Sequence, residues 1–262
     1  MRIPENSSAH DFCRRLKDFD GCKYRSPQGF YPLTLALAPW FAATALLFCA
    51  AGLYLGFLVA PTDTQQGEAY RIIFIHVPAA WMSLLIYLLL ALCAGSGLVF
   101  NARLASMMAS ALAPTGAMFA FLTLWSGCLW AKPVWGAWWV WDTRLMSELV
   151  LMLLYAGFIA LQSMIYSPLI ADRAGALLAL AGLVDVPINV LSVQWWSTLH
   201  QGASVSLTAA PSVTFSMLSG ILTMTFGFCM YACAVVLLRL RCEILERERD
   251  SGWVAVHPRV AP

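Results

Sequence analysis

The chain has 262 residues, of which 60% are hydrophobic and 11% are charged, and its mean hydropathy is +0.72. Soluble domains carry about 25% charged residues, so this composition excludes a water-soluble globule and leaves no room for a separate soluble catalytic head. The formal net charge is only +2 and the charges gather at the two ends of the chain, which excludes nucleic acid as a partner.

Six apolar segments follow one another along the chain. Each is long enough to cross a bilayer as a helix, and the apolar runs are continuous, whereas the strands of a membrane barrel alternate. The sequence therefore predicts an all-α polytopic membrane protein with six transmembrane helices, kinked at Pro39, Pro114 and Pro187. The segments cover residues 33–59, 76–100, 104–129, 145–167, 174–196 and 211–238.

Two polar ends flank the membrane domain, which we place at residues 33–240. Residues 1–32 form an N-terminal segment that carries six Lys or Arg, and residues 241–262 form a C-terminal tail. The apolar run after residue 32 is too long for a signal-peptide core and lacks a small-residue cleavage site, so we expect an uncleaved first helix. Charges of alternating sign over residues 239–250 predict a solvated extension of the last helix.

The basic residues are divided unevenly between the two sides of the predicted bundle. Of the 16 Lys and Arg, only Arg71, Lys132 and Arg144 lie in the three longer loops, at residues 60–75, 130–144 and 197–210. The positive-inside rule therefore predicts cytoplasmic termini at both ends and places these three loops on the outer face. Function is expected on that face, because the inner loops are only a few residues long.

Several kinds of chemistry are excluded by missing motifs. The eight cysteines form no C-x-x-C pair, so neither a thioredoxin-type redox centre nor a covalent c-type haem site is predicted. The chain also lacks a G-x-x-x-x-G-K-[ST] phosphate loop and an H-E-x-x-H zinc motif. We therefore expect a protein that is not an ATPase or a zinc protease, and any energy that it needs has to come from a partner.

The loop at residues 130–144 concentrates tryptophan. It holds five of the chain's 11 tryptophans. Tryptophan favours the membrane interface, so an aromatic belt is the simple interpretation. Five in one short loop exceed what anchoring needs, and they predict a wide apolar surface with indole N–H donors at its rim, suited to a large planar ligand. They are Trp130, Trp135, Trp138, Trp139 and Trp141.

Two of the four histidines flank this loop in the predicted topology. His76 starts the second helix and His200 lies in the third outer loop, whereas His10 and His257 lie in the tails and are expected to be solvated. A single histidine at a helix end is usually a hydrogen-bonding residue. A pair on one face makes metal ligation an equal alternative, because two imidazoles can hold a six-coordinate haem between them.

The charged residues near these histidines suggest a site for an anionic ligand. Arg71 and Arg144 are placed to face carboxylates at the edge of a bound macrocycle, since guanidinium and carboxylate pair in a two-pronged geometry. For Arg144 an ion pair with Asp142 is an equal alternative. Lys132 is expected to be a simple interfacial charge, and Asp142 is expected to close the tryptophan loop onto the next helix.

Three polar residues fall inside predicted spans. Glu148 lies one turn beyond Arg144, which predicts an ion pair between them. Asp185 and Asn189 flank Pro187, and we expect them to satisfy backbone groups freed by the proline or to form helix–helix hydrogen bonds. A polar path through the membrane is the alternative for this pair.

Three motifs form one pattern in the chain, namely Trp135-Gly-Ala-Trp138-Trp139-Val-Trp141-Asp142, His76-Val-Pro78-Ala-Ala-Trp81 and Ser197-Thr-Leu-His200-Gln201-Gly202. With them, residues 30–240 resemble the cytochrome c maturation protein C (CcmC) family of tryptophan-rich, WWD-type haem-handling membrane proteins. The tryptophan signature carries most of this resemblance, and a histidine motif on either side of it completes the pattern. Larger relatives with the same signature have more helices and more histidines, so six spans favour this smaller family.

The resemblance implies a function. A member of this family presents non-covalent haem b at the periplasmic face of the bacterial inner membrane and passes it to the haem chaperone CcmE during system I cytochrome c maturation. The ATP-binding-cassette pair CcmA and CcmB and the small protein CcmD complete the complex, so the chain itself is expected not to be an enzyme. It also implies His76 and His200 as axial ligands, the tryptophans as a haem platform, Asp142 as a loop-shaping residue, and Arg71 and Arg144 as propionate partners.

Two other functions remain open from the residues alone. A membrane redox subunit would pass electrons from a bis-histidine haem to a quinone, and it would normally need a second haem pair or a quinone pocket. A polytopic transporter would use the aromatic loop as an outer gate, and internal repeats with matching polar residues would support that interpretation.

Overall fold

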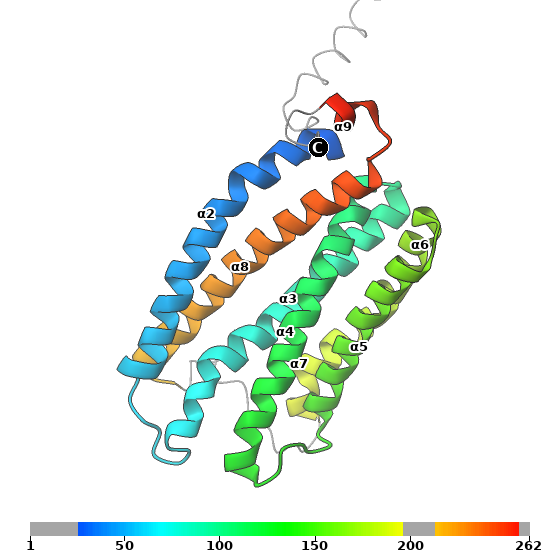
Figure 1. The fold of residues 1–262 in the computed structure, drawn as a ribbon. Helices are drawn as coiled ribbons and strands as arrows, with labels where there is room; N and C mark the ends of the chain where they lie inside the picture. Colours follow the sequence, from blue (N-terminus) through cyan, green and yellow to red (C-terminus); the bar gives the residue numbers. More distant parts are fainter. Residues whose placement is uncertain (1–25, 196–212, 257–262) are drawn as a thin grey trace, which may run out of the picture.

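The computed structural model describes residues 26–195 and 213–256, and this part of the chain is almost entirely helical. Six of its helical stretches are long and apolar enough to cross a membrane, which confirms the predicted fold class. They lie side by side as a bundle in which α2 packs along α8, and α3 and α4 form the centre (Figure 1). The six stretches are Pro27–Val59, Glu68–Phe100, Arg103–Trp135, Thr143–Met164, Pro168–Ser192 and Phe215–Arg247.

Each of the first two spans combines an α-helix with a short turn of another helical type. Helix α2 (Pro27–Tyr54) is capped by the Ser26 side chain, which accepts from the N–H of Gly29, and it continues into a π-helical turn, Leu55–Val59. A 3-10 turn, Glu68–Ile72, then leads into α3 (Ile73–Phe100). Because α3 begins before His76, this histidine lies within the first turns of the helix rather than at its start, which corrects the predicted boundary.

Helix α4 (Arg103–Trp135) is longer than the sequence analysis predicted. It continues through Trp130 and stops where Gly136 adopts φ +78°, a left-handed conformation that glycine accommodates without strain. The Gly136 N–H closes the last turn on the Lys132 carbonyl at 3.0 Å. Trp130 and Trp135 are therefore helical residues, and the loop that remains before α5 is short.

The following helices cover the other side of the centre. Helix α5 (Thr143–Met164) packs on α4, and the predicted fifth span consists of α6 (Pro168–Ala181), a 3-10 turn (Gly182–Val184) and α7 (Asp185–Trp195). The break lies one turn before Pro187, where a proline lacks the N–H and crowds the preceding turn. Pro39 and Pro114, in contrast, lie inside α2 and α4, which continue through them.

The last long helix, α8 (Phe215–Arg247), continues past residue 238, which confirms the predicted helical extension, and α9 (Gly252–Val256) follows it. The sequence predicts that this extension is solvated, but Arg247 is mostly buried. Its side chain is only 15% exposed and bonds to Asp172 at 2.7 Å and to Glu243 at 2.5 Å. This end of α8 is therefore tied to α6 by buried charge, and Trp253 of α9 packs edge-on against Tyr31 of α2 at 5.7 Å.

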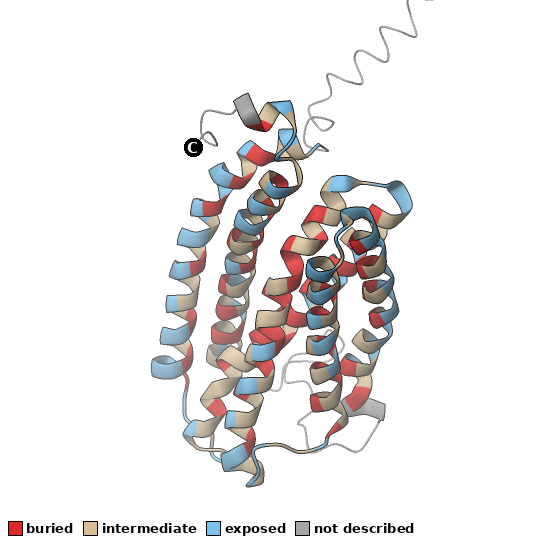
Figure 2. Ribbon diagram, turned by 45° about the vertical axis from the view of Figure 1, so that its right-hand side comes forward, coloured by how far each residue is buried: buried red, intermediate tan, exposed pale blue. Residues whose placement is uncertain are grey.

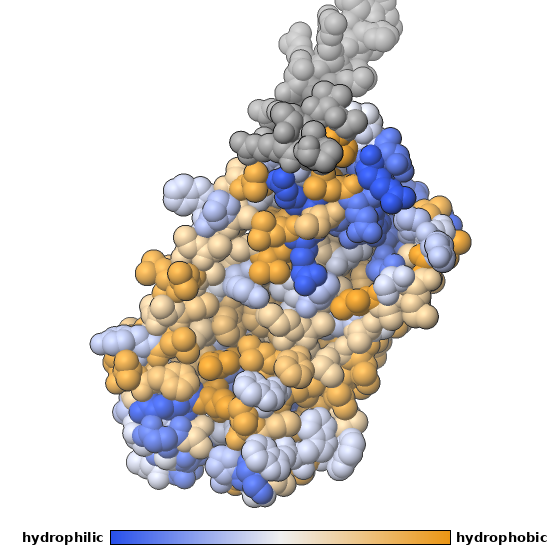
Figure 3. Space-filling model, in the orientation of Figure 1, coloured by the Kyte–Doolittle hydropathy of each residue, from blue (hydrophilic) through white to orange (hydrophobic). Residues whose placement is uncertain are grey.

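Burial follows the helix faces, with buried residues turned toward the centre and exposed ones turned outward (Figure 2). Gly116 shows how closely α4 and α5 approach, because an added Cβ would lie 2.2 Å from the Tyr155 ring. On the face shown in Figure 3, apolar residues occupy the middle and hydrophilic residues gather toward the two ends. The largest fully buried side chains include Tyr87, Phe119, Leu151, Tyr155 and Met224.

Candidate haem site

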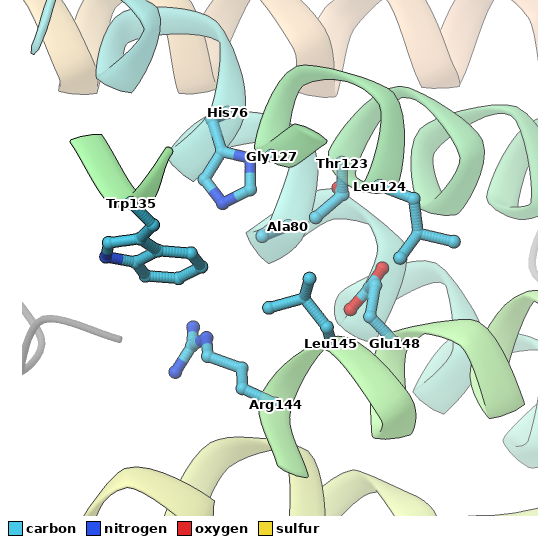
Figure 4. A pocket seen from close by; sticks show the side chains of 9 residues that line it. All are labelled: His76, Ala80, Thr123, Leu124, Gly127, Trp135, Arg144, Leu145 and Glu148. Carbon is cyan, nitrogen blue, oxygen red and sulfur yellow. The ribbon is translucent and has the colours of Figure 1, made fainter. Parts of the chain in front are cut away.

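A cleft opens between α3, α4 and α5 at the end of the bundle that carries the short loop after α4. It holds about 410 Å³, counting the part that is open to solvent. A histidine, a tryptophan and an arginine point into it from three different helices (Figure 4). Its lining consists of His76, Ala80, Thr123, Leu124, Gly127, Trp135, Arg144, Leu145 and Glu148.

The imidazole of His76 is half-buried against α4. Its Nδ1 lies 3.0 Å from the hydroxyl oxygen of Ser126, and Gly127 lies beneath the ring. Figure 4 shows the ring directed into the space that it shares with Trp135 and Arg144. The structure thus brings His76 into one cleft with Trp135 of the tryptophan segment.

Trp135 forms one wall of the cleft, and Trp130 stands behind it one and a half turns earlier on α4. The two indoles meet edge to face, with ring centroids 4.9 Å apart. The Trp130 Nε1–H donates to the side-chain carbonyl of Gln66 at 2.9 Å. Trp130 is thus held by the loop between the first two spans, and it braces Trp135 in a geometry favoured for aromatic pairs.

The loop between α4 and α5 presents the other tryptophans of the cluster. Trp138 is 56% exposed and Trp141 is 78% exposed. Trp139 packs edge-on against Trp141 at 5.8 Å, and its Nε1–H is buried without a hydrogen-bond partner among the described residues. A buried donor of this kind is costly unless a ligand or another group satisfies it.

Asp142 begins α5. Its carboxylate accepts from the backbone N–H of Arg144 at 2.9 Å, which makes it the N-cap of the helix. The loop that carries Trp138, Trp139 and Trp141 therefore ends directly at a capped helix start. The cap fixes the first turn of α5, from which the Arg144 side chain points toward Trp135 (Figure 4).

Arg71 occupies a different position from the one that its sequence neighbours suggested. Its guanidinium donates to the carbonyl oxygens of Gly56 at 2.8 Å and Ala60 at 3.1 Å, and it pairs with the Glu68 carboxylate. It is absent from the lining of the cleft. Arg71 therefore fastens the end of the first span to the start of the second.

The floor of the cleft is polar. Glu148, only 4% exposed, accepts from the Ser83 hydroxyl at 2.8 Å and from the Asn189 amide at 3.0 Å. Within the described chain no N–O contact under 4.0 Å joins Glu148 to Arg144, so the predicted ion pair is wrong, because the carboxylate turns inward to helices α3 and α7. The helix–helix hydrogen bond predicted for Asn189 is confirmed.

The remaining predicted residues are less central to the cleft. Lys132 donates to the Gly136 carbonyl at 3.1 Å and lies 5.9 Å from the Trp138 ring, which suits an interfacial charge that also closes the helix end. Asp185 has one buried oxygen without a partner among the described residues. His200, His10 and His257 lie outside the described residues.

Three contributors escaped the sequence analysis, namely Ser126, Gln66 and Ser83. Each is a small or amide side chain, and its importance depends on a contact across 50 or more residues of sequence. The end of α4, in contrast, could have been predicted from Gly136, because a glycine that follows a lysine in the last turn commonly ends a helix.

This arrangement combines three kinds of recognition. An imidazole can ligate a metal, indole faces can cover a planar apolar ring, and a guanidinium can bind carboxylates. These three side chains converge in one cleft, at the end of the bundle that carries the loop between α4 and α5. The chemistry fits an amphipathic metal macrocycle with acidic substituents.

Comparison with known proteins gives the family. The sequence profile of CcmC, described as heme exporter protein C, matches residues 21–255. The chain belongs to the CcmC family. Heme exporter protein C of Escherichia coli K12 is 42% identical over 229 residues, covering 87% of this chain and 92% of that protein.

More distant members agree. Heme exporter protein C of Haemophilus influenzae is 39% identical over 231 residues, covering 88% of this chain and 94% of the relative. A putative cytochrome c biosynthesis ccmC-like mitochondrial protein of Marchantia polymorpha is 41% identical over 209 residues, covering 78% of this chain and 89% of the relative. Membership in the CcmC family confirms the resemblance drawn from the tryptophan and histidine motifs.

Proposed function

We propose that this protein presents non-covalent haem b at the periplasmic face of the bacterial inner membrane and transfers it to the haem chaperone CcmE in system I cytochrome c maturation. The observation that carries this proposal is the convergence of His76, Trp135 and Arg144 in one cleft. The names of the relatives, which describe heme exporters and cytochrome c biosynthesis, support the ligand and the process.

The residues of the cleft fit haem as cargo. Haem brings iron, a planar apolar ring and two carboxylates. His76 offers an imidazole for the iron, Trp135 offers an apolar wall, and Arg144 offers a guanidinium for a propionate. The buried Nε1–H of Trp139 is a donor for which an acceptor on the bound molecule would provide a partner.

The proposed roles differ in part from those implied by the family resemblance. We assign Trp135, Trp138, Trp139 and Trp141 to the haem platform, with Asp142 holding their loop. Trp130 is given a bracing role, because its N–H is bonded to Gln66 and its ring supports Trp135.

The two arginines are also proposed to have different roles. Arg144 is proposed as the propionate partner, because it lines the cleft. Arg71 is proposed as a loop anchor, because two backbone carbonyls and Glu68 engage its guanidinium. His200 remains the proposed second axial ligand, because the predicted topology places it on the same face as His76 and the family motif includes it.

The protein is proposed to bind haem and hand it over without catalysis of its own. His76 and His200 hold the iron, the tryptophans hold the ring, and release requires that these contacts loosen. Energy for release is proposed to come from the ABC subunits CcmA and CcmB, with CcmD in the same complex. This division fits a chain that carries no nucleotide-binding loop.

The orientation is proposed from the distribution of basic residues. Arg71, Lys132 and Arg144 lie at the cleft end, whereas most other Lys and Arg lie toward the opposite end and the tails, so the cleft is assigned to the periplasm and both termini to the cytoplasm. Cysteines introduced at exposed Ala137 and Glu246 in a cysteine-free variant test this with a membrane-impermeant maleimide. Labelling of position 137 in intact spheroplasts supports the orientation, and labelling of position 246 instead inverts it.

Transfer is tested with the full complex. The protein is co-expressed with CcmE and the ABC subunits in haem-replete cells, and CcmE is then purified. Its haem content is compared between cells with the wild type and cells with the Arg144→Gln or Trp135→Ala variant. Both variants are expected to lower the haem content of the chaperone several-fold, whereas the exposed control Glu246→Gln leaves it unchanged. Full loading by both cleft variants would refute the site.

A further inference from the structure

The hydroxyl of Ser126 sits between the His76 imidazole and the backbone of its own helix. Ser126 is 2% exposed, so water does not compete for its hydrogen bonds. Its oxygen lies 3.0 Å from His76 Nδ1, 2.6 Å from the Leu122 carbonyl and 3.2 Å from the Thr123 carbonyl. Three polar neighbours therefore surround a group that carries one hydrogen.

The position of that hydrogen follows from the two carbonyls. A serine hydroxyl has one hydrogen to donate and two lone pairs to accept with, whereas a carbonyl oxygen can only accept. A separation of 2.6 Å between two oxygens is a good O–H···O hydrogen bond and would be repulsive without a hydrogen between them. The Ser126 hydrogen therefore lies toward Leu122, and its lone pairs face the imidazole.

We infer that Ser126 accepts a hydrogen bond from Nδ1–H of His76 and so fixes the neutral imidazole as the tautomer whose lone pair is on Nε2. A neutral imidazole carries a hydrogen on one ring nitrogen and ligates a metal through the other. The hydrogen-bond partner of the N–H determines which nitrogen carries the hydrogen. Ser126 is thus a positioning residue. That Nε2 is the iron-binding atom rests on the proposed function, whereas the tautomer itself does not.

Gly127 completes the seat of the ring. A Cβ at this position would lie 3.2 Å from His76 Cε1, closer than ordinary van der Waals contact. Consecutive residues of α4 therefore act together, because Ser126 bonds one ring nitrogen and Gly127 leaves room for the neighbouring carbon. Figure 4 shows Gly127 next to the His76 ring. The imidazole is held in one orientation across the α3–α4 contact before any ligand arrives.

The direct test is nitrogen NMR of the haem-free, full-length protein with ring-labelled histidine at pH 8, where an ordinary imidazole is neutral. His76→Gln assigns the His76 signals among those of the four histidines. We expect a protonated, pyrrole-type Nδ1 and an unprotonated, pyridine-type Nε2 in the wild type. A protonated Nε2, whether alone or together with Nδ1, would overturn the inference.

Substitutions then separate positioning from helix stability. Ser126→Ala should redistribute the His76 tautomers, and Ser126→Thr, which restores the acceptor, should return the wild-type signals. Ser96→Ala is the matched control, because Ser96 makes the same hydrogen bond to the carbonyl four residues earlier, at 2.7 Å, on the exposed side of α3. A Ser126→Ala spectrum identical to the wild type would contradict the assignment.

Haem binding provides the second readout. A ligating histidine that loses its hydrogen-bond partner usually lowers the affinity for the metal 10- to 100-fold. Ser126→Ala is therefore expected to weaken haemin binding by about that factor and to shift the reduction potential of the bound haemin. Ser126→Thr and Ser96→Ala should behave like the wild type. If the wild type binds no haemin while the NMR tautomer is as expected, the proposed function fails and the inference about Ser126 stands.

Discussion

Replacement of Glu148 by alanine tests the polar floor of the cleft. Glu148 joins three helices, because it accepts from Ser83 of α3 and from Asn189 of α7 and itself belongs to α5. Ser83 has a second acceptor in the Ala80 carbonyl at 2.9 Å, so its hydroxyl can turn to it when the carboxylate is removed. Asn189, which is 2% exposed, loses the acceptor of its amide.

The expected cost follows from that asymmetry. A buried donor left without a partner costs about 1–3 kcal/mol, and only Asn189 is left in that condition. Glu148→Ala is therefore expected to lower the free energy of unfolding by about 1–3 kcal/mol, measured by reversible SDS unfolding in mixed micelles with tryptophan fluorescence. The exposed control Glu246→Ala should stay within about 0.5 kcal/mol of the wild type.

A double-mutant cycle makes the test sharper. If the hydrogen bond carries the effect, Asn189→Ala in the Glu148→Ala background should cost less than it does alone, by about 0.5 kcal/mol or more. Strict additivity of the two substitutions would refute the reasoning, as would a Glu148→Ala protein that is as stable as the Glu246→Ala control.

Three further predictions concern the walls of the cleft and the far end of the bundle. Gly127→Ala is expected to displace the His76 ring and weaken haem binding, and unchanged affinity would show that the ring is not constrained there. Gln66→Ala removes the hydrogen bond that holds Trp130, worth about 0.5–1.5 kcal/mol, so haem affinity should fall about two- to tenfold while Gln65→Ala has no effect. Arg247→Ala breaks a mostly buried ion pair and should cost about 3 kcal/mol of unfolding free energy in the same SDS assay, without altering the haem affinity of the folded protein; a stability equal to that of the wild type would contradict this.

The number of spans was predictable from the sequence because lipid imposes a simple rule. Every backbone group in the apolar zone needs a partner within its own segment, so long apolar runs become helices whatever their neighbours are. The same rule does not fix where a helix ends. Helix α4 continues through Gly116 and Gly127 and ends only at Gly136, where the backbone adopts φ +78°.

The convergence of three of the predicted residues was readable from the sequence, but the contacts of their neighbours were not. His76, Trp135 and Arg144 do converge, as expected from their places next to the outer loops. Arg71 instead bonds to the carbonyls of Gly56 and Ala60, which the π-helical turn after α2 brings within reach. That turn has no sequence signature, so spacing alone could not locate the partners of Arg71.

Glu148 shows the same limit. Spacing of one helical turn from Arg144 favours an ion pair on an isolated helix. In the bundle, Ser83 and Asn189 offer hydrogen bonds from two other helices, and the carboxylate turns to them. Such partners become visible only when the packing of α3, α5 and α7 is known, because they are 65 and 41 residues away in the sequence.

The most direct test of the central claim is the visible absorption spectrum of the protein purified from haem-replete cells, oxidised and then reduced, next to its histidine variants. We predict six-coordinate b-type haem bands in the wild type and in His10→Ala and His257→Ala. The bands should be lost or shifted in His76→Ala and His200→Ala. A colourless wild type, or equal loss of haem from the tail variants, would contradict a haem site built on these two histidines.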